Sequence, residues 1–550
     1  MFFIHKKPPR SHALGEPLRH ENHPRPTTRR DFIAAGFLSG PAMVMAPAWL
    51  GALLKPNRAN AGAPPLDADI SPLLAATECN VPASGVGLPF ICFDLAGGAN
   101  LVGSEVIVGQ QSGTNVLNTQ TNFLTTAGYG KLGVPGNMVP SSTANVNSSL
   151  GLLWHADGAI KRGITSMIAP ATAAGVNGAV ICAMSQNDTQ TNPHNPMYGI
   201  AMAGRKGQLL QLIGTDSSVS GGNSMAPMEL INPALQPSTI SQPSDATSLV
   251  PIPPGGKQDP LSVEVLETQT RISGGNGLYT GGGGGTGAFS GALGMPTALY
   301  ASAAQDAALK NQVRCAYVKA VNTANQFGDP SSLDPTLDSN IKSIATSFGA
   351  NAFMDNDFAK TATVMKLVLN GYAAAGTIAM GGYDYHDGSR ATGEMRNFKA
   401  GQMIGAVLQY AALIGSPVMI YVFSDGSLNS NSMVDNSPAG RGKLGWQGDN
   451  SSVASTFFLA YGAGKGKPML RGAPSTQQIG YFTADGSVVS TSSPAANSVD
   501  SLVQLVLLNY MGLSGTDANF ASAFQNWTGM PQGLGSASQL AGMTVFQPIM

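Results

Sequence analysis

The chain has 550 residues, of which 43% are apolar, 11% are charged and 7% are aromatic, with 68 glycines and 36 prolines. This length can bury a sizeable core. The sparse charge excludes Glu- and Lys-rich disorder, and the absence of sustained heptads excludes a coiled coil. Residues 1–61 carry nine Lys or Arg and three acidic residues, which leaves 21 basic and 28 acidic side chains in the other 489 residues. That body, with a net charge of −7, lacks the basic excess that nucleic-acid binding needs.

The N-terminal segment has the features of an export signal. Arg29 and Arg30 precede an apolar stretch at 32–54, and a small-x-small sequence ends at Ala61. The pattern resembles the twin-arginine signal, which implies recognition by the twin-arginine export machinery and a periplasmic or extracellular mature protein. An N-terminal membrane anchor is the alternative, which the prolines and small residues of the stretch disfavour. No later segment has 18 uninterrupted apolar residues, so no permanent membrane span is expected in residues 62–550.

Along the body, short apolar runs alternate with helical patterns. Strands are expected at five places, residues 88–95, 179–184, 377–380, 417–423 and 455–461. Helices are expected at 297–327, 353–372, 396–413 and 499–511. Strands that alternate with helices pair in parallel, so residues 62–550 are predicted to form one α/β domain with a mostly parallel central sheet flanked by helices. The Ser-, Pro- and Gly-rich residues 217–294 are expected to be an insertion or a long loop.

Cysteine and histidine limit the chemistry that the body can carry. The four cysteines contain no C-x-x-C pair, so neither a thiolate zinc site nor a thioredoxin-like motif is indicated. Outside the leader only three histidines remain, His155, His194 and His386. The glycine-rich segments lack the spacing of a phosphate-binding loop, and the absence of a G-x-G-x-x-G after a strand disfavours a dehydrogenase.

Polar residues gather next to the predicted strands, where ligands of parallel sheets bind. They lie at 93–100, 192–196, 381–387 and 424–427, after the first four strands, and at 447–451, directly before the fifth. The chemistry-bearing side chains in these segments are Asp94, His194, Asp384, His386, Asp425 and Asp449. In a strand, Asp384 and His386 point to the same face.

The order of these motifs resembles an exported bacterial family, the domain of unknown function numbered 1501, in the alkaline phosphatase and sulfatase superfamily. The resemblance covers about residues 88–513 and is strongest over 377–464. It implies an alkaline-phosphatase-like sandwich and a metal-dependent hydrolase of phosphate or sulfate esters with a Ser or Thr nucleophile. The chain departs from the family pattern by carrying Asn100 in place of Asp, Pro193 in place of Ser and Asn450 in place of His. The Phe-Gly-Arg expected after Asp425 is also missing.

A first hypothesis is therefore an exported hydrolase with one divalent ion, zinc, calcium or manganese. The metal ligands are predicted to be Asp384, His386, Asp449 and His194, and the catalytic residues Asp384, His386 and Asp425. Because Pro193 replaces the serine, the nucleophile is expected to be a metal-bound hydroxide, Thr189 or Thr191.

Other interpretations of the same residues stay open. Asp384 and His386 fit a structural carboxylate–imidazole pair, Asp425 fits a turn cap, and His194 fits a loop residue. The losses at the family positions favour a second hypothesis, a catalytically degenerate member that acts as a binding or assembly protein of the cell envelope. A third hypothesis is carbohydrate or polymer binding through the Tyr- and Asn-rich loops.

Overall fold

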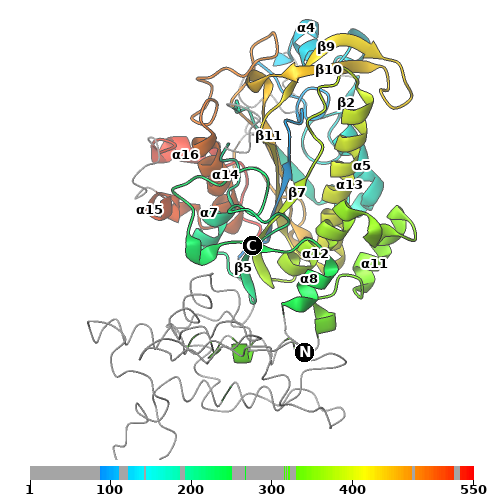
Figure 1. The fold of residues 1–550 in the computed structure, drawn as a ribbon. Coiled ribbons are helices and arrows are strands. Elements are labelled where there is room, and N and C mark those ends of the chain that lie inside the picture. The colour runs from blue at the N-terminus through cyan, green and yellow to red at the C-terminus, as the bar shows by residue number, and fades with distance from the viewer. Residues whose placement is uncertain are drawn as a thin grey trace, which may run out of the picture.

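The fold is that of a computed structural model, which describes most of the body of the chain. The described residues are 87–110, 122–141, 144–185, 192–249, 330–472, 477–524 and 533–550, with a few isolated positions between 267 and 327. The expected export signal, Thr189, Thr191, and most of the helical pattern at 297–327 lie outside these residues. The described chain forms a central sheet with helices on both sides (Figure 1).

In the described chain the central sheet has eight strands in the order β12-β4-β11-β8-β1-β7-β5-β6. The strands are β1 (Phe90–Leu95), β4 (Val176–Ile181), β5 (Leu210–Gly214), β6 (Ser238–Thr239), β7 (Ala373–Met380), β8 (Val418–Ser424), β11 (Thr456–Tyr461) and β12 (Gln478–Ile479). Neighbouring strands pair in parallel, except that β11 runs antiparallel to β4 and β8. The predicted α/β fold with a mostly parallel central sheet is confirmed, and each of the five predicted runs overlaps a strand.

The direction of β11 follows from its connection to β8. The chain leaves β8 through an antiparallel hairpin, β9 (Leu428–Asp435) and β10 (Lys443–Asp449), and then enters β11 without a long crossover helix. The hairpin brings the chain back to the edge of the sheet where β8 ends, and a strand that starts at that edge must run antiparallel to β8. The beginning of β11 therefore lies beside the end of β8, where Phe457 pairs with Val422. This brings the residues before β11 to the edge where the parallel strands end.

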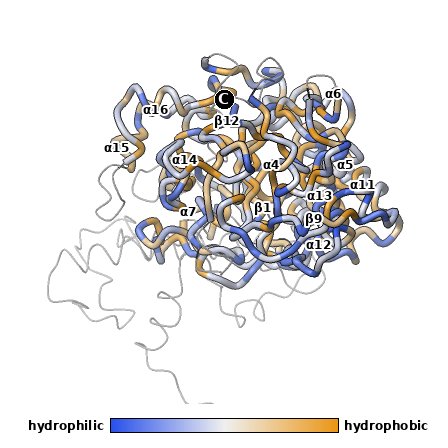
Figure 2. The backbone as a smooth tube through the Cα atoms, turned by 90° about the horizontal axis from the view of Figure 1, so that it is seen from above, coloured by the Kyte–Doolittle hydropathy of each residue, from blue (hydrophilic) through white to orange (hydrophobic). Residues whose placement is uncertain are grey.

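Helices cover the two faces of the sheet as separate layers. One layer contains α5 (Ala159–Met167), α11 (Ser339–Ala345), α12 (Asn356–Leu369) and α13 (Ala391–Ile414). The other contains α7 (Met197–Met202), α14 (Val499–Ser514), α15 (Phe520–Phe524) and α16 (Ala537–Met543) (Figure 1). Because side chains alternate along a strand, β1 sends Phe93 into the core of the first layer and Phe90 into that of the second. In Figure 2 the more hydrophobic residues lie mostly toward the interior of the described chain.

The remaining elements are short and lie in the connections. They are α4 (Thr126–Lys131), β2 (Val146–Asn147), β3 (Trp154–His155), α6 (Pro170–Ala174) and α8 (Pro243–Ser248). The segment expected to be an insertion at 217–294 thus has regular structure in its first part, since β6 extends the sheet and α8 begins with a capping box. A two-residue strand leaves no alternating pattern in the sequence, which is why this segment reads as a loop. Among the described helices, none has both the length and the apolar character that crossing a bilayer requires.

Two long helices of the first layer approach closely because glycines face the contact. A Cβ on Gly401 of α13 would lie 2.1 Å from the carbonyl oxygen of Ile160 in α5. A Cβ on Gly163 of α5 would lie 2.2 Å from the carbonyl oxygen of Phe398 in α13. The backbones are therefore in contact, and neither position has room for a side chain.

Substitution of Gly401 by Ala is expected to lower the free energy of unfolding by about 1–3 kcal/mol, because an overpacked contact forces the helices apart. The matched control is Gly542→Ala in α16, where nothing lies within 4 Å of the added Cβ. There the helix propensity of Ala is expected to leave stability unchanged or raise it by up to about 1 kcal/mol. Urea unfolding measures both, and equal stabilities of the two variants would contradict the close contact.

Candidate functional site

The segment that follows β7 presents two candidate ligands on one side. Tyr383 and Tyr385 are buried, whereas Asp384 and His386 are exposed, as expected for extended backbone with alternating side chains. The backbone N–H of Tyr383 donates to the carbonyl oxygen of Ala96, so this segment runs beside the chain that leaves β1. Burial of the two tyrosines thus directs the carboxylate and the imidazole outward together.

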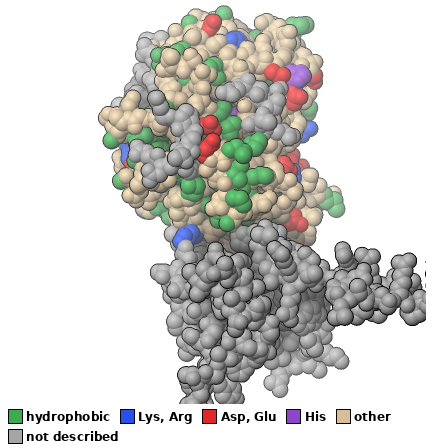
Figure 3. Space-filling view, turned by 60° about the vertical axis from the view of Figure 1, so that its left-hand side comes forward, with side chains coloured by type: hydrophobic (Ala, Val, Ile, Leu, Met, Phe, Trp, Pro, Cys, Tyr) green, Lys and Arg blue, Asp and Glu red, His purple; other side chains and the backbone are tan. Residues whose placement is uncertain are grey.

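Asp449, at the end of β10, joins these two side chains from a second segment of the chain. The Nε2 atom of His386 lies 2.7 Å from Oδ1 of Asp384, and the potential ligand atoms of Asp384, His386 and Asp449 all lie within 4.8 Å of one another. The side chains of Asp384 and His386 are 54% and 43% exposed, so the group opens to solvent. Figure 3 shows acidic side chains beside a histidine near the upper margin of the described surface.

The chain after β1 passes directly under the segment that bears Asp384. Gly97 has φ 123°, and a Cβ there would lie 2.4 Å from the backbone nitrogen of Asp384. Only glycine combines this backbone conformation with such a close approach. The N–H of Gly97 also donates to Oδ1 of Asp425 at 2.9 Å, which ties the turn to the end of β8.

The buried carboxylate of Glu394 in α13 holds the β9–β10 hairpin against this helix. Glu394 Oε1 lies 2.7 Å from Lys443 Nζ of β10 and 2.9 Å from the guanidinium of Arg390, and Oε2 lies 2.6 Å from Arg162. Burial alone raises the pKa of Glu394, but the charges of Arg390 and Lys443 outweigh it and hold this pKa below its ordinary value. The guanidinium of Arg390 also stacks 4.5 Å from the ring of Trp446, three residues before Asp449. The ionised Glu394 therefore fixes the start of the strand that ends in Asp449.

Beneath the exposed group lies a second, buried cluster of polar side chains. Oδ2 of Asp425 accepts from Asn223 Nδ2 at 3.2 Å, and Asp94 at the end of β1 accepts from the N–H and the hydroxyl of Ser224 at 2.7 and 3.1 Å. Burial raises the pKa of Asp94 to about 7, and the nearby charge of Asp425 adds to this rise while the bonds from Ser224 oppose it. The two strand-end carboxylates thus anchor the consecutive residues Asn223 and Ser224.

His194 belongs to this buried cluster, since neither of its ring nitrogens joins the 4.8 Å group. Its Nε2 lies 3.2 Å from the hydroxyl of Ser185, its ring stacks on Phe423 with centroids 5.8 Å apart, and its Nδ1 has no hydrogen-bond partner among the described residues. Burial lowers the pKa of His194 to about 3, so the ring is neutral at physiological pH. The hydroxyl of Ser185 donates to the backbone carbonyl of Asp425 at 2.5 Å. Because its hydroxyl proton is used in this hydrogen bond, Ser185 connects the chain after β4 with the chain after β8.

Further buried polar atoms without a hydrogen-bond partner in the described chain lie next to the β9–β10 hairpin. Asn100 Oδ1 and Ser427 Oγ are buried and have no hydrogen-bond partner in the described chain. The side-chain nitrogen of Asn100 is 3.4 Å from the carbonyl oxygen of Leu428, the residue that pairs with Asp449 across the hairpin. Buried polar atoms without a protein partner are commonly satisfied by ordered water.

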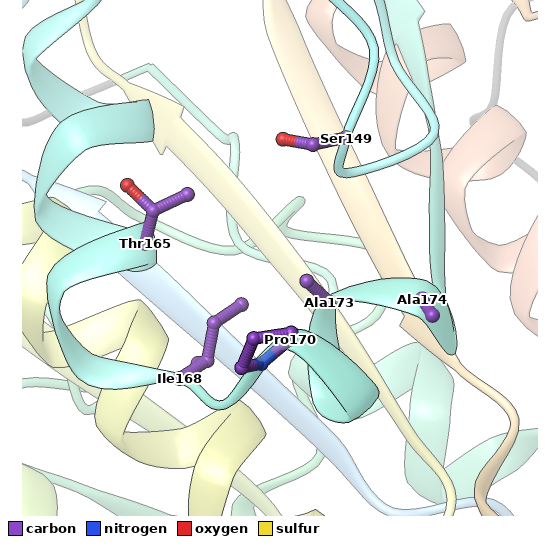
Figure 4. A pocket seen from close by; sticks show the side chains of 6 residues that line it. All are labelled: Ser149, Thr165, Ile168, Pro170, Ala173 and Ala174. Carbon is purple, nitrogen blue, oxygen red and sulfur yellow. The ribbon is translucent and has the colours of Figure 1, made fainter.

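Two hollows lie apart from the exposed group. The larger, about 370 Å³, lies between α5, α6 and a preceding loop, and its lining side chains are shown in Figure 4: Ser149, Thr165, Ile168, Pro170, Ala173 and Ala174. None of these can act as an acid, a base or a strong metal ligand at neutral pH. The other, about 280 Å³, is lined by residues between 218 and 231 and includes Asn223, the partner of Asp425. Neither hollow is lined by Asp384, His386 or Asp449.

Of the residues predicted as metal ligands, the structure brings together Asp384, His386 and Asp449 and places His194 in the buried layer. Asp425, predicted to be catalytic, is 1% exposed and bonds to backbone and to Asn223. Sequence reasoning missed Ser185, which directly follows the predicted strand at 179–184. It also missed Asn223 and Ser224, because they lie in a segment without hydrophobic periodicity.

The pH dependence of stability is expected to reveal the buried state of Asp94. A carboxyl group whose pKa is raised in the fold contributes stability below its unfolded pKa, near 3.8, and this contribution is lost as the pH rises through about 7. The difference in unfolding free energy between wild type and Asp94→Asn should therefore fall by roughly 2–4 kcal/mol between pH 4 and pH 8. Urea unfolding at a series of pH values measures it. Parallel stability curves for the two proteins would contradict the assignment.

Comparison with known proteins adds no family to this geometry. No protein-family model matches the chain, and neither a curated protein nor a solved structure matches it. The resemblance to the exported hydrolase family consequently stays a prediction from the motifs.

Proposed function

We propose that this protein binds one divalent metal ion through Asp384, His386 and Asp449 and acts as a metal-dependent hydrolase of phosphate or sulfate esters. The observation that carries the proposal is the convergence of two carboxylates and an imidazole from separate chain segments, with ligand atoms within 4.8 Å. The alkaline-phosphatase-like character of the fold is part of the same proposal, supported by the mostly parallel sheet and the order of the strand-end motifs.

The donor set fits zinc or manganese better than calcium. Ligand atoms bound to one zinc ion at about 2.0–2.2 Å lie about 3–3.5 Å apart, which small side-chain movements of the exposed group would allow. Calcium prefers six to eight oxygen ligands, whereas an imidazole beside carboxylates suits zinc and manganese.

The roles of the side chains follow from their exposure. Three protein ligands that face solvent leave coordination positions open to an ester, which is typical of catalytic rather than structural sites. An ion held there would polarise an ester oxygen and lower the pKa of a water molecule. The Nε2 atom of His386 and Oδ1 of Asp384, 2.7 Å apart, would exchange this contact for bonds to the ion, and Asp449 would approach from the hairpin. Asp425 would position Asp384 indirectly. It accepts a hydrogen bond from the N–H of Gly97, and Gly97 lies directly beneath Asp384.

A second candidate is a catalytically degenerate protein that binds an ester or an anionic polymer at the cell envelope without cleaving it. The observation in its favour is the engagement of Ser185, whose hydroxyl donates to the backbone carbonyl of Asp425. His194, neutral and stacked on Phe423, is likewise held in the buried layer. In this case the metal site would remain and turnover would be absent.

We also infer that the chain is exported through the twin-arginine machinery to the periplasm or the cell exterior. This inference comes from Arg29, Arg30 and the apolar stretch that follows them, all outside the described residues. Because that route carries folded proteins, the metal would be inserted before export.

Loss of one ligand is expected to weaken metal binding. The variant Asp449→Asn removes one of the two carboxylates, so the affinity for zinc should fall at least about tenfold, together with hydrolysis of aryl phosphates and sulfates. The control is Asp387→Asn, which changes a neighbouring exposed carboxylate that bonds to Ser389 and lies outside the group.

Zinc and manganese titrations of chelator-treated protein, followed by assays on aryl esters, check this expectation. A wild-type protein that binds neither ion would overturn the metal site. Binding without turnover on any aryl ester would favour the degenerate protein over the hydrolase.

A further inference from the structure

The two arms of the metal site come from distant parts of the chain and need a fixed spacing. Asp384 and His386 follow β7, whereas Asp449 ends β10, more than sixty positions later in the sequence. All three side chains are exposed, and their potential ligand atoms lie within 4.8 Å of one another. Backbone hydrogen bonds between residues 388–389 and Trp446 join the two arms, and buried side chains below them connect the arms further.

Tyr385 lies between the two ligands of the first arm and points inward, where it is 2% exposed. Its phenol oxygen accepts from the backbone N–H of Asn100 at 3.1 Å and donates to Oδ1 of Asn397 at 3.1 Å. The side-chain nitrogen of Asn397 donates in turn to the carbonyl oxygen of Asn100 at 3.3 Å and to Glu105 at 3.0 Å. These bonds close a ring that ties the first arm to the turn after β1 and to helix α13.

The ring of Tyr385 also reaches the second arm. Its centroid lies 6.3 Å from that of Trp446, which precedes Asp449 in β10, and 6.3 Å from that of Tyr383. Helix α13 leaves space for both rings at Gly393, where a Cβ would lie 2.7 Å from Trp446 Nε1 and 2.9 Å from Tyr385 Cε2. Tyr385 is thus a buried side chain of the first arm that packs against Trp446 of the second.

We propose that Tyr385 is a positioning residue for the metal site, with its phenol setting the distance between the Asp384–His386 arm and the Asp449 arm. This inference rests on the proposed metal site. In extended backbone, any shift of Tyr385 is transmitted to both flanking residues, so a loosened phenol displaces two ligands at once. Partners that orient metal ligands commonly change metal affinity about 10–100-fold when they are removed.

The neighbouring tyrosine offers a matched control. Tyr383 is buried in the same segment and flanks Asp384 on the other side, but its phenol donates to the backbone carbonyl of Arg396 in α13. Tyr385→Phe and Tyr383→Phe therefore each remove one buried hydroxyl and keep the aromatic ring. Only the first breaks the link to Asn100.

Zinc affinity is measured for the full folded protein by competition with a chromophoric chelator, and stability by urea unfolding with excess chelator. We expect Tyr385→Phe to bind zinc about tenfold more weakly and Tyr383→Phe less than about threefold more weakly, at similar losses of stability. Asn397→Ala, which removes the acceptor of the Tyr385 phenol, should weaken binding by a similar factor and serves if Tyr385→Phe does not fold.

The outcomes separate this inference from the proposed function. A wild-type protein without zinc affinity overturns both. Zinc binding in wild type with an unchanged affinity in Tyr385→Phe overturns the positioning role alone. Equal weakening in Tyr385→Phe and Tyr383→Phe also overturns it, because both variants would then act through general loss of stability.

Discussion

The ionised Glu394 beneath the β9–β10 hairpin is the interaction on which the site geometry depends. It accepts from Arg390 and Lys443, and the same Arg390 stacks on Trp446, so one buried carboxylate ties α13 to the strand that ends in Asp449. Removing one partner of a buried ion pair leaves an uncompensated charge and is strongly destabilising. Moving the hairpin away from α13 would separate Glu394 from Lys443 and break this ion pair. The ion pair therefore helps to hold Asp449 near Asp384 and His386.

Burial separates the strand-end polar groups into two layers with different chemistry. Asp384, His386 and Asp449 face water, where an ion can enter. Asp94 and His194 are buried, and both favour their neutral forms because charge is costly in a low dielectric. The same edge of the sheet thus combines a buried polar cluster that holds loops in place with an exposed group that can bind a ligand.

The antiparallel strand β11 explains why a motif that precedes a strand joins motifs that follow strands. Residues 381–387 and 424–427 follow parallel strands, whereas 447–451 lie before β11. In a fully parallel sheet, Asp449 would lie at the opposite edge, away from Asp384 and His386. Because the hairpin returns the chain to the carboxyl edge, the reversed direction of β11 brings Asp449 to the same side.

The sequence by itself determined the fold class and the principal strands, because short apolar runs and helical periodicity are local signals that burial in a two-layered core preserves. It also predicted that Asp384 and His386 would share a face if they lay in a strand. In the structure both lie beyond the end of β7 and are exposed on one side. Only the tertiary structure decided that Asp449 joins them while His194 and Asp425 remain buried, and that Asn223 and Ser224 anchor the strand ends. Those outcomes depend on strand direction, hairpin geometry and desolvation, which arise from contacts between residues far apart in the chain.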